Sequence, residues 1–277
     1  MWLWTLFAYV LATCNLNISG VSASNVYNVG VFTVTIEDSD FHICSSSDER
    51  HIVFQTSPSS PFLSIGNATV TQPPIRDGNY QLEESVQRQT SAISIENVNV
   101  KSELNIEMSG QLFNVENIAM ATYTFNVSVQ DMSSKQLLFD ARVSSMTNHT
   151  IDRLFFSYWC DANEAFFGFG ESFTNLNLRS RVVPVLVSEQ GVGRGLQPIT
   201  DALNNDTEGT GGHWYTTYAP KPVYLTNQNR SLFFHNSEVG TVTCGRELMP
   251  LNRYHNSTSQ PRSWCRWKSG RVLCRSQ

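Results

Sequence analysis

The sequence is poor in the features that mark helical bundles, metal centres and disulfide scaffolds. Six cysteines in 277 residues are too few for a disulfide-rich fold. No Cys-x-x-Cys pair and no His/Cys cluster has the spacing of a zinc site, so we expect neither a metal nor a cofactor. Gly-x-Ser-x-Gly is absent too, which excludes a nucleophile elbow. No segment repeats apolar residues at helical spacing, which leaves strands as the main elements.

The longest apolar run opens the chain. Residues Met1 to Ala12 read MWLWTLFAYVLA, and Val21-Ser22-Ala23 places small or branched residues at the positions that a signal peptidase reads. We therefore interpret residues 1–23 as a secretory signal peptide. The alternative is an N-terminal anchor, but the run is shorter than the about 20 apolar residues that span a bilayer. The chain is thus predicted to be secreted, extracellular or in an endomembrane lumen, without a membrane span.

Asn-x-Ser/Thr acceptor sites agree with secretion. Six of them follow the predicted signal, and we expect these sites to carry glycans on exposed loops or strand ends. Their asparagines are Asn67, Asn126, Asn148, Asn205, Asn229 and Asn256.

The cysteine count leaves the pairing open. Removal of the signal would leave an odd number, which in a secreted protein implies a free thiol or an intermolecular pair. We interpret the remaining cysteines as buried thiols with at most one bridge. They are Cys44, Cys160, Cys244, Cys265 and Cys274.

Positive charge gathers at the C-terminal end. Seven of the 19 Lys and Arg residues lie in the last 32 positions, where Glu247 is the only acid. The apolar alternation of the preceding residues also stops there. A basic tail can bind nucleic acid or anionic surfaces, which a secreted protein seldom needs. We therefore interpret residues 246–277 as a non-native or disordered tail, foreign to the domain, and expect no nucleic-acid partner.

Between these ends the apolar pattern has a period of two. In one run, every second residue is apolar, from Ala121 through Phe125 to Val129, and the others are polar or small. Such strands have one face on a core and the other toward water. Similar short runs recur along the chain, separated by turn sequences. Residues 24–245 are therefore predicted to form one all-β domain, an antiparallel β-sandwich.

The most informative stretch runs from Phe166 to Gly195 and reads FFGFGESFTNLNLRSRVVPVLVSEQGVGRG. Two glycines flank Phe169, Glu171 follows, and a valine-rich strand leads to a glycine-rich loop. This stretch resembles the N-terminal region of glycoside hydrolase family 31, most closely its sulfoquinovosidase-like branch. The resemblance implies a galactose-mutarotase-like supersandwich, which in the family accompanies a catalytic (β/α)8 barrel. It also implies a carbohydrate partner, an α-glycoside, which the family hydrolyses with retention.

The loop from Ser188 to Gly195 holds the best candidate site, and the resemblance places it at the mouth of the active site. Its glycines let the backbone approach a ligand closely. Arg194 offers a planar fork of donors, and Gln190 can both donate to and accept from a sugar hydroxyl. With Glu189 they form the predicted substrate-binding set. The alternative is a tight structural loop in which Arg194 pairs with Glu189 or another acid.

Two further motifs are interpreted as structural. Trp159 to Glu164 looks like the family's nucleophile motif, Trp-x-Asp-Met-Asn-Glu, but it precedes the Gly-x-Gly-Glu motif at Gly168 to Glu171, whereas the family's nucleophile follows that motif. We predict the end of a strand and a turn at Trp159 to Glu164. The Gly-x-Gly-Glu motif should turn the chain, with Glu171 bound to backbone or to an arginine.

A group of aromatic residues is the remaining candidate. His213-Trp214-Tyr215 offers an aromatic platform for the face of a sugar. The alternative is core packing, which is the more common role of aromatic residues in a β domain.

Together these patterns predict the N-terminal, active-site-flanking domain of a secreted retaining α-glycosidase. Double displacement needs two carboxyl groups, which the family's barrel supplies. The barrel is missing from this chain, so we expect no catalytic residue here and no activity alone. The alternative is a stand-alone secreted β-sandwich that binds carbohydrate or a protein partner.

Overall fold

The computed structural model describes residues 4–10, 24–57, 60–71, 83–148, 150–171, 174–206, 210–235, 239–247 and 263–269. Almost all of its regular structure is β. The strands are β1 (Trp4–Val10), β2 (Asn25–Val29), β3 (Phe32–Glu37), β4 (Asp40–Ser45), β5 (Asp48–Gln55), β6 (Leu63–Thr71), β7 (Glu83–Arg88), β8 (Ala92–Ile93), β9 (Asn97–Ser102), β10 (Asn105–Phe113), β11 (Ala119–Ser128), β12 (Gln136–Ser145), β13 (Arg153–Cys160), β14 (Phe166–Gly170), β15 (Val182–Val185), β16 (Pro220–Thr226), β17 (Arg230–His235), β18 (Gly240–Glu247) and β19 (Ser263–Ser269). One short helix, α1 (Ile199–Asp206), lies within the described residues.

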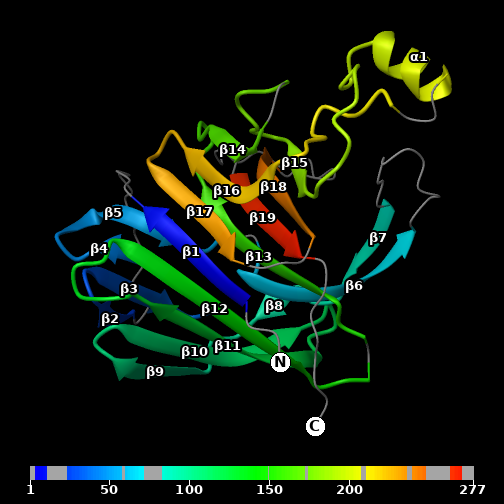
Figure 1. Cartoon of the computed structure of the whole chain (residues 1–277). Coiled ribbons are helices and arrows are strands. Elements are labelled where there is room, and N and C mark those ends of the chain that lie inside the picture. Colours follow the sequence, from blue (N-terminus) through cyan, green and yellow to red (C-terminus); the bar gives the residue numbers. More distant parts are fainter. Residues whose placement is uncertain are drawn as a thin grey trace, which may run out of the picture.

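The described strands form three antiparallel sheets (Figure 1). The largest has the order β14-β16-β17-β1-β12-β11-β10-β8, with β9 also paired to β10. A second has the order β15-β18-β19-β13-β6-β7, and the third is the meander β2-β3-β4-β5. The helix α1 projects from the top of the view, away from the sheets. The prediction of an all-β antiparallel sandwich is therefore confirmed.

The period-two pattern of the sequence explains which face of each strand is buried. Along β10, Ile106 and Met108 are fully buried, while Glu107 and Ser109 between them are only partly buried. The neighbouring strand β11 repeats this alternation in register, because Phe125 lies opposite Met108. A one-residue slip would turn both apolar rows toward water, so the pattern determines the register.

Aromatic rings from all three sheets meet in the core. Phe54 of the β2–β5 meander packs on Phe139 of β12 with ring centroids 5.0 Å apart, and on Phe156 of β13 at 5.7 Å. Phe125 of β11 stacks on Phe139 at 5.5 Å. Each buried ring removes about 150–250 Å² from water, and aromatic pairs add about 0.5–1.5 kcal/mol each. This cluster therefore holds the three sheets together.

The first and last strands occupy the middle of sheets rather than their edges. In Figure 1, β1 (blue) lies between β12 and β17, and β19 (red) lies between β13 and β18. These strands fall in residues 1–23 and 246–277, which the sequence predicts to be a signal peptide and a foreign tail. That division into domains stays a prediction. No helix in the described part of the chain is long and apolar enough to cross a membrane.

Three cysteines have described side chains, and all three are buried: Cys44, Cys160 and Cys244. Burial raises the pKa of the Cys244 thiol, and the nearby Cys160 adds to the effect. The expectation of buried thiols is confirmed for these three. The side chains of Cys265 and Cys274 lie outside the described residues.

Candidate functional site

The loop predicted as the site follows β15 and packs on the segment that precedes β16. The Ser188 N–H donates to the Thr217 carbonyl at 3.0 Å, and the Arg194 N–H donates to the Gly211 carbonyl at 2.7 Å. The Thr216 hydroxyl donates to the Gln190 carbonyl at 2.8 Å. Because backbone groups at both ends of the loop are bonded, Gln190 and Arg194 project from a fixed frame.

Two of the loop's glycines are required by close backbone packing. Gly191 has φ +67°, and a Cβ there would lie 2.3 Å from the Gly212 nitrogen. A Cβ on Gly193 would lie 2.3 Å from the Thr200 hydroxyl oxygen, which belongs to α1. Distances below 3.0 Å cannot be accommodated without movement. The glycines thus serve the packing of this loop, while the side chains of Glu189, Gln190 and Arg194 are half-buried.

A chain of polar contacts brings the predicted binding residues together. The Gln190 amide nitrogen donates to Glu171 Oε2 at 3.4 Å, and Arg194 Nη2 donates to Gln190 Oε1 at 2.7 Å. The Tyr218 hydroxyl donates to Glu189 Oε1. That hydrogen bond, and the negative charge of Glu189, raise the pKa of Tyr218. Both ends of the Gln190 amide are therefore oriented, which is the condition for selective hydrogen bonding to a ligand.

Glu171 has a partner that the sequence did not indicate. Its backbone N–H donates to the Ala219 carbonyl at 3.3 Å, and its carboxylate accepts from Gln190. The partner of the carboxylate is thus a glutamine and not the backbone or the arginine that the sequence predicts. The preceding strand β14 shifts its register between Gly168 and Gly170, where it pairs with β16. This irregularity carries Glu171 to the loop and fits the expected turn of the chain.

The aromatic candidate lies beside the same loop. The His213 and Tyr215 rings stack at 5.3 Å with an angle of 16° between their planes. Arg181 lies over the Trp214 ring at 5.1 Å, and Trp214 packs against the core. Burial raises the pKa of Tyr215. Because Trp214 packs against the core and Arg181 covers one face of its ring, the structure supports the packing role for Trp214. An aromatic platform for a sugar, formed by His213 and Tyr215, stays a prediction.

Exposed apolar side chains lie in the loop and in the residues that flank it in the sequence. Four of them, which we call the apolar rim, are Val187, Val192, Leu196 and Ile199. Val192 is 76% exposed and Leu196 65% exposed. Large apolar side chains gathered at a surface mark places where another surface binds. The segment that holds Gln190 and Arg194 therefore also presents large apolar side chains to solvent.

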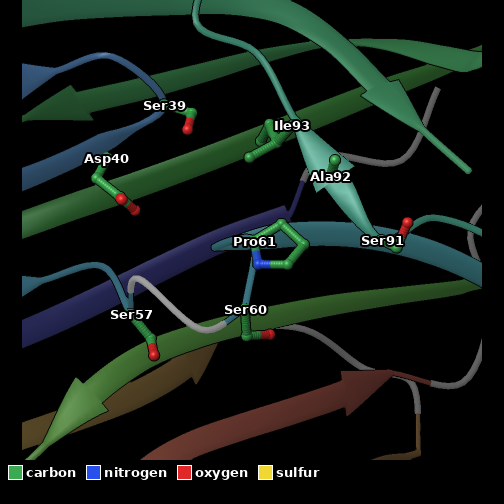
Figure 2. Close-up of a pocket in the computed structure, with 8 residues that line it drawn as sticks. All are labelled: Ser39, Asp40, Ser57, Ser60, Pro61, Ser91, Ala92 and Ile93. Atoms are coloured by element: carbon green, nitrogen blue, oxygen red, sulfur yellow. The ribbon is translucent and has the colours of Figure 1, made fainter. Parts of the chain in front are cut away.

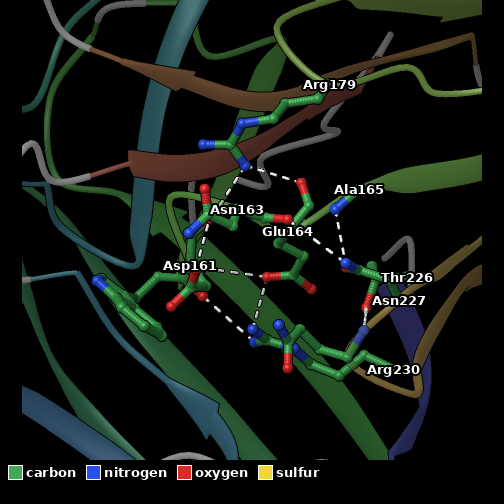
Figure 3. A network of polar contacts seen from close by, with 10 residues as sticks. Asp161, Asn163, Glu164, Ala165, Arg179, Thr226, Asn227 and Arg230 are labelled. Atoms are coloured by element: carbon green, nitrogen blue, oxygen red, sulfur yellow. Dashed lines mark hydrogen bonds and ion pairs between the residues drawn. The ribbon is translucent and has the colours of Figure 1, made fainter.

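The motif that looks like a nucleophile sequence is a structural turn (Figure 3). Trp159 and Cys160 end β13, and the turn closes through a 3.1 Å bond from the Glu164 N–H to the Asp161 carbonyl. Glu164 is 0% exposed and forms an ion pair with Arg230 at 2.6 Å. The interpretation as a strand end and a turn is confirmed.

A second arginine closes the same turn. Arg179 Nη1 donates to the carbonyls of Asp161 and Glu164 at 2.9 and 2.8 Å. The sequence did not indicate either arginine as a partner of this turn, because both lie well beyond it in the chain. Their contacts tie the loop after β14 and the start of β17 to the end of β13 (Figure 3).

A separate polar pocket lies between the β3–β4 turn, the segment before β6 and β8 (Figure 2). It holds about 220 Å³ and is lined by Ser39, Asp40, Ser57, Ser60, Pro61, Ser91, Ala92 and Ile93. Burial raises the pKa of Asp40, and a 2.8 Å hydrogen bond from Thr56 opposes that shift. None of the predicted binding residues lines it. Within the described residues, no His, Cys, Asp and Glu side chains are grouped to hold a metal.

The predicted glycan acceptors occupy different settings. Asn148, Asn205 and Asn229 are exposed, and Asn229 lies in the turn between β16 and β17. Asn67 and Asn126 are half-buried within β6 and β11, rather than on the loops or strand ends that we expected. Asn256 lies outside the described residues.

Comparison with known proteins identifies the domain. The sequence pattern of the glycosyl hydrolase 31 N-terminal galactose mutarotase-like domain matches residues 62–242. A sulfoquinovosidase of Escherichia coli (strain K12) is 26% identical over 207 residues, which cover 72% of this chain and 28% of that enzyme. A sulfoquinovosidase of Agrobacterium fabrum is 31% identical over 91 residues, which cover 32% of this chain and 14% of that enzyme.

The fold agrees with these matches. The structure of a GH31 family sulfoquinovosidase from E. rectale, in complex with the aza-sugar inhibitor IFGSQ, has a TM-score of 0.61 at 16% identity, covering 87% of this chain and 32% of that chain. This chain thus spans less than a third of each relative's length. The part of the chain that the structure describes forms three antiparallel sheets and contains no (β/α)8 barrel. The chain belongs to the glycoside hydrolase family 31 N-terminal, galactose mutarotase-like domains.

Proposed function

We propose that this chain is the carbohydrate-binding, active-site-flanking domain of a secreted retaining α-glycosidase. Its ligand is an α-glycoside, and Gln190, Arg194 and Glu189 contact that ligand. Catalysis belongs to a barrel that works together with this domain, and the domain by itself is inactive.

One observation carries the proposal: hydrogen bonds join Glu171, Gln190 and Arg194, and the loop that holds Gln190 and Arg194, with its flanking residues, carries the apolar rim. The amide of Gln190 is held from both sides, and Arg194 projects from the same loop. A sugar offers hydroxyls that both donate and accept, which suits an oriented amide beside a guanidinium. The apolar rim suits the surface of a barrel, which would close the site from the other side.

The expected inactivity follows from the chemistry of the carboxylates. Retention requires a nucleophile and an acid/base about 5–5.5 Å apart. In the motif that looks like a nucleophile sequence, the aspartate at the nucleophile position is Asp161, and its carboxylate accepts from the Asn163 N–H of the turn at 2.8 Å. Glu164 of the same motif is fully buried and paired with Arg230. Both carboxylates therefore support the turn and not a double displacement.

Secretion is part of the proposal. It predicts that Asn148, Asn205 and Asn229 carry glycans, since these three are exposed. Asn67 and Asn126 are acceptors too, although their half-buried positions should lower their occupancy. Enzymatic removal of N-glycans from protein secreted by eukaryotic cells, followed by mass spectrometry of the peptides, measures each occupancy. Protein that stays in the cells without glycans would contradict secretion.

The binding site is tested on the full chain with an α-glucoside and an α-sulfoquinovoside as probes. Ligand-observed NMR should detect weak binding, with Kd of about 1 mM, because half of the site is missing. Gln190→Ala and Arg194→Ala should each weaken it by about tenfold, the value of one hydrogen bond near 1.4 kcal/mol. Gln197→Ala is the matched control, since this exposed glutamine bonds only Asp201 at 2.9 Å.

Two outcomes would change the conclusion. Equal binding by all four proteins would remove the loop from the site. Hydrolysis of either glycoside by the purified full chain would contradict the assignment of catalysis to a missing barrel. Sequencing of full-length transcripts across the codons for Thr243 to Gln277 tests the barrel itself, and a terminal exon as written would favour a stand-alone binding sandwich.

A further inference from the structure

The polar pocket beside Asp40 is built from three segments that lie far apart in the sequence (Figure 2). The connection from β3 to β4 supplies Ser39 and Asp40, the segment before β6 supplies two serines and a proline, and the segment at β8 supplies a serine and two apolar residues. Its volume of about 220 Å³ is several times the share of about 30 Å³ that one water has in the liquid. The pocket can therefore hold a small organic group.

Backbone hydrogen bonds fix the walls of this pocket. The Ser60 N–H donates to the Ser57 carbonyl at 3.1 Å, and the Ser91 N–H donates to the Phe113 carbonyl at 2.8 Å. Ala92 of β8 is paired with Phe113 of β10. Because these contacts are made within the protein, the pocket has its shape before a ligand binds.

Asp40 supplies the pocket with a carboxylate that Thr56 holds in place. The Thr56 hydroxyl, in a residue only 1% exposed, donates to Asp40 Oδ1 at 2.8 Å. Figure 2 shows the Asp40 side chain directed toward the side of the pocket where Pro61 lies. Among the described residues that line the pocket there is no lysine, arginine or histidine. The lining therefore offers a negative charge without a positive one.

The surroundings of Asp40 are also negative. Burial, with the charges of Glu37 and Asp38 in the same connection, raises the pKa of the Asp40 carboxyl, so its negative charge is poorly compensated. Arg88 reaches the pocket only through Ser60, because its Nη2 donates to the Ser60 hydroxyl oxygen at 3.5 Å and it does not itself line the pocket. A cation bound beside Asp40 would supply the missing positive charge.

The lining discriminates between classes of cationic and polar ligand. A calcium ion takes about 6–8 oxygen ligands, whereas Asp40 is the one carboxylate among the described lining residues. No aromatic side chain of the described residues lines the pocket, so the apolar face of a sugar ring has nothing flat to pack on. A primary ammonium has three donors and no acceptor, which matches a carboxylate beside serine hydroxyl oxygens.

We propose that this pocket binds the primary ammonium group of a small amine. The ammonium donates to the Asp40 carboxylate and to the Ser39 hydroxyl oxygen, and the carbon atoms next to it pack on Pro61, Ala92 and Ile93. The site is independent of the Gln190 loop and of the α-glycoside, so the failure of one proposal leaves the other standing.

The test uses the full chain and two pairs of probes that differ in the ammonium group. n-Butylammonium is compared with 1-butanol, and glucosamine with glucose, by ligand-observed NMR titration. At least one of the two amines should bind, with a Kd of about 1 mM, while its neutral counterpart should bind at least about tenfold more weakly, because a charge-assisted hydrogen bond is lost. Binding of n-butylammonium alone would identify an alkyl amine as the ligand, and binding of glucosamine alone an amino sugar.

A matched pair of substitutions tests the role of Asp40. Asp40→Asn removes the charge inside the pocket and should weaken binding of the amine by about tenfold or more. Asp38→Asn removes the same charge from an exposed neighbour outside the lining, and it should weaken binding by less than about threefold, since solvent screens that charge. Asp38 has φ +52°, which asparagine also adopts readily, so this control keeps the turn.

A third variant tests whether the amine lies in the cavity. Ala92 is exposed and lines the pocket, so Ala92→Leu should fill the space without a cost to the core and abolish binding of the amine. At about ten times its Kd, the amine should raise the melting temperature of the unchanged chain by about 3 °C, and that of Asp40→Asn by less than about 1 °C. Potassium chloride at the same concentration is the control for ionic strength.

Several results would overturn the proposal. Equal affinities for each amine and its neutral counterpart would mean that the ammonium group is not recognised. An unchanged affinity in Asp40→Asn, or an equal loss in Asp38→Asn, would remove the contact with Asp40. Binding of neither amine to the unchanged chain, or full binding to Ala92→Leu, would refute the site.

Discussion

Replacing Glu164 by alanine tests a buried ion pair of the fold. The carboxylate is 0% exposed and accepts from Arg230 Nη2 at 2.6 Å and from the Asp161 N–H at 3.2 Å. Glu164→Ala leaves the guanidinium of Arg230, whose side chain is only 12% exposed, without this carboxylate. It also leaves the Asp161 N–H without this acceptor. The substitution thus removes one charge and keeps its partner inside the protein.

The magnitude follows from burial. Breaking a buried ion pair by removing one member costs about 3–5 kcal/mol, because the other charge stays desolvated. Arg230 retains a little solvent contact and its bond to the Trp159 carbonyl, which places the expected loss near 3 kcal/mol. Arg230→Met in the same background removes the stranded charge. The double variant should therefore be more stable than Glu164→Ala alone.

Urea unfolding of the full chain, followed by circular dichroism, measures these free energies of unfolding. Glu116→Ala is the control, since Glu116 is exposed in the turn between β10 and β11, and it should change the stability by less than about 0.5 kcal/mol. A loss below about 1 kcal/mol for Glu164→Ala would refute the reasoning. A double variant that is less stable than Glu164→Ala would also refute it, because the cost would then not come from an unpaired arginine.

Four other outcomes are expected. Gly193→Ala should destabilise the protein by about 1–3 kcal/mol in urea, since the added Cβ would lie 2.3 Å from the Thr200 hydroxyl oxygen; a neutral result would mean that the loop moves freely. Burial raises the pKa of Asp40 in the folded state, so the protein loses stability as the pH rises from the unfolded-state pKa of about 3.9 through the folded-state pKa. Asp40→Asn should therefore stabilise the protein at pH 7 but not below a pH of about 3. An equal gain in stability at the two pH values would exclude titration of Asp40 as the cause. The buried thiols Cys44, Cys160 and Cys244 should resist alkylation in the native protein and react in urea, and labelling of native protein detected by peptide mass spectrometry would contradict their burial. The apolar rim should make the purified chain bind a hydrophobic dye or aggregate, whereas a monodisperse chain without dye binding would count against a missing partner surface.

Much of the fold could be predicted from local patterns. The alternation in β10 and β11 can be recognised from neighbouring residues alone, and it predicts both that the segment is a strand and which of its faces is buried. The glycine-rich loop was recognisable because its residue types are unusual in a strand-rich sequence.

Contacts between distant segments could not be predicted in this way. The partnership of Glu164 with Arg230, of Gln190 with Glu171, and the pocket beside Asp40 each join residues from different strands or loops. No local pattern encodes which segments become neighbours, because that depends on the order of strands in the sheets.

The sequence by itself determined that the domain is built of strands, which faces of those strands are buried, the family, and the position of the candidate loop. Each of these depends on residue types that lie close together in the chain. Only the tertiary structure decided that Gln190 is oriented by Glu171 and Arg194, and that Glu164 supports a turn instead of a reaction. It also decided that the first strand pairs between β12 and β17. These are consequences of strand order and register, which bring together groups that the chain keeps far apart.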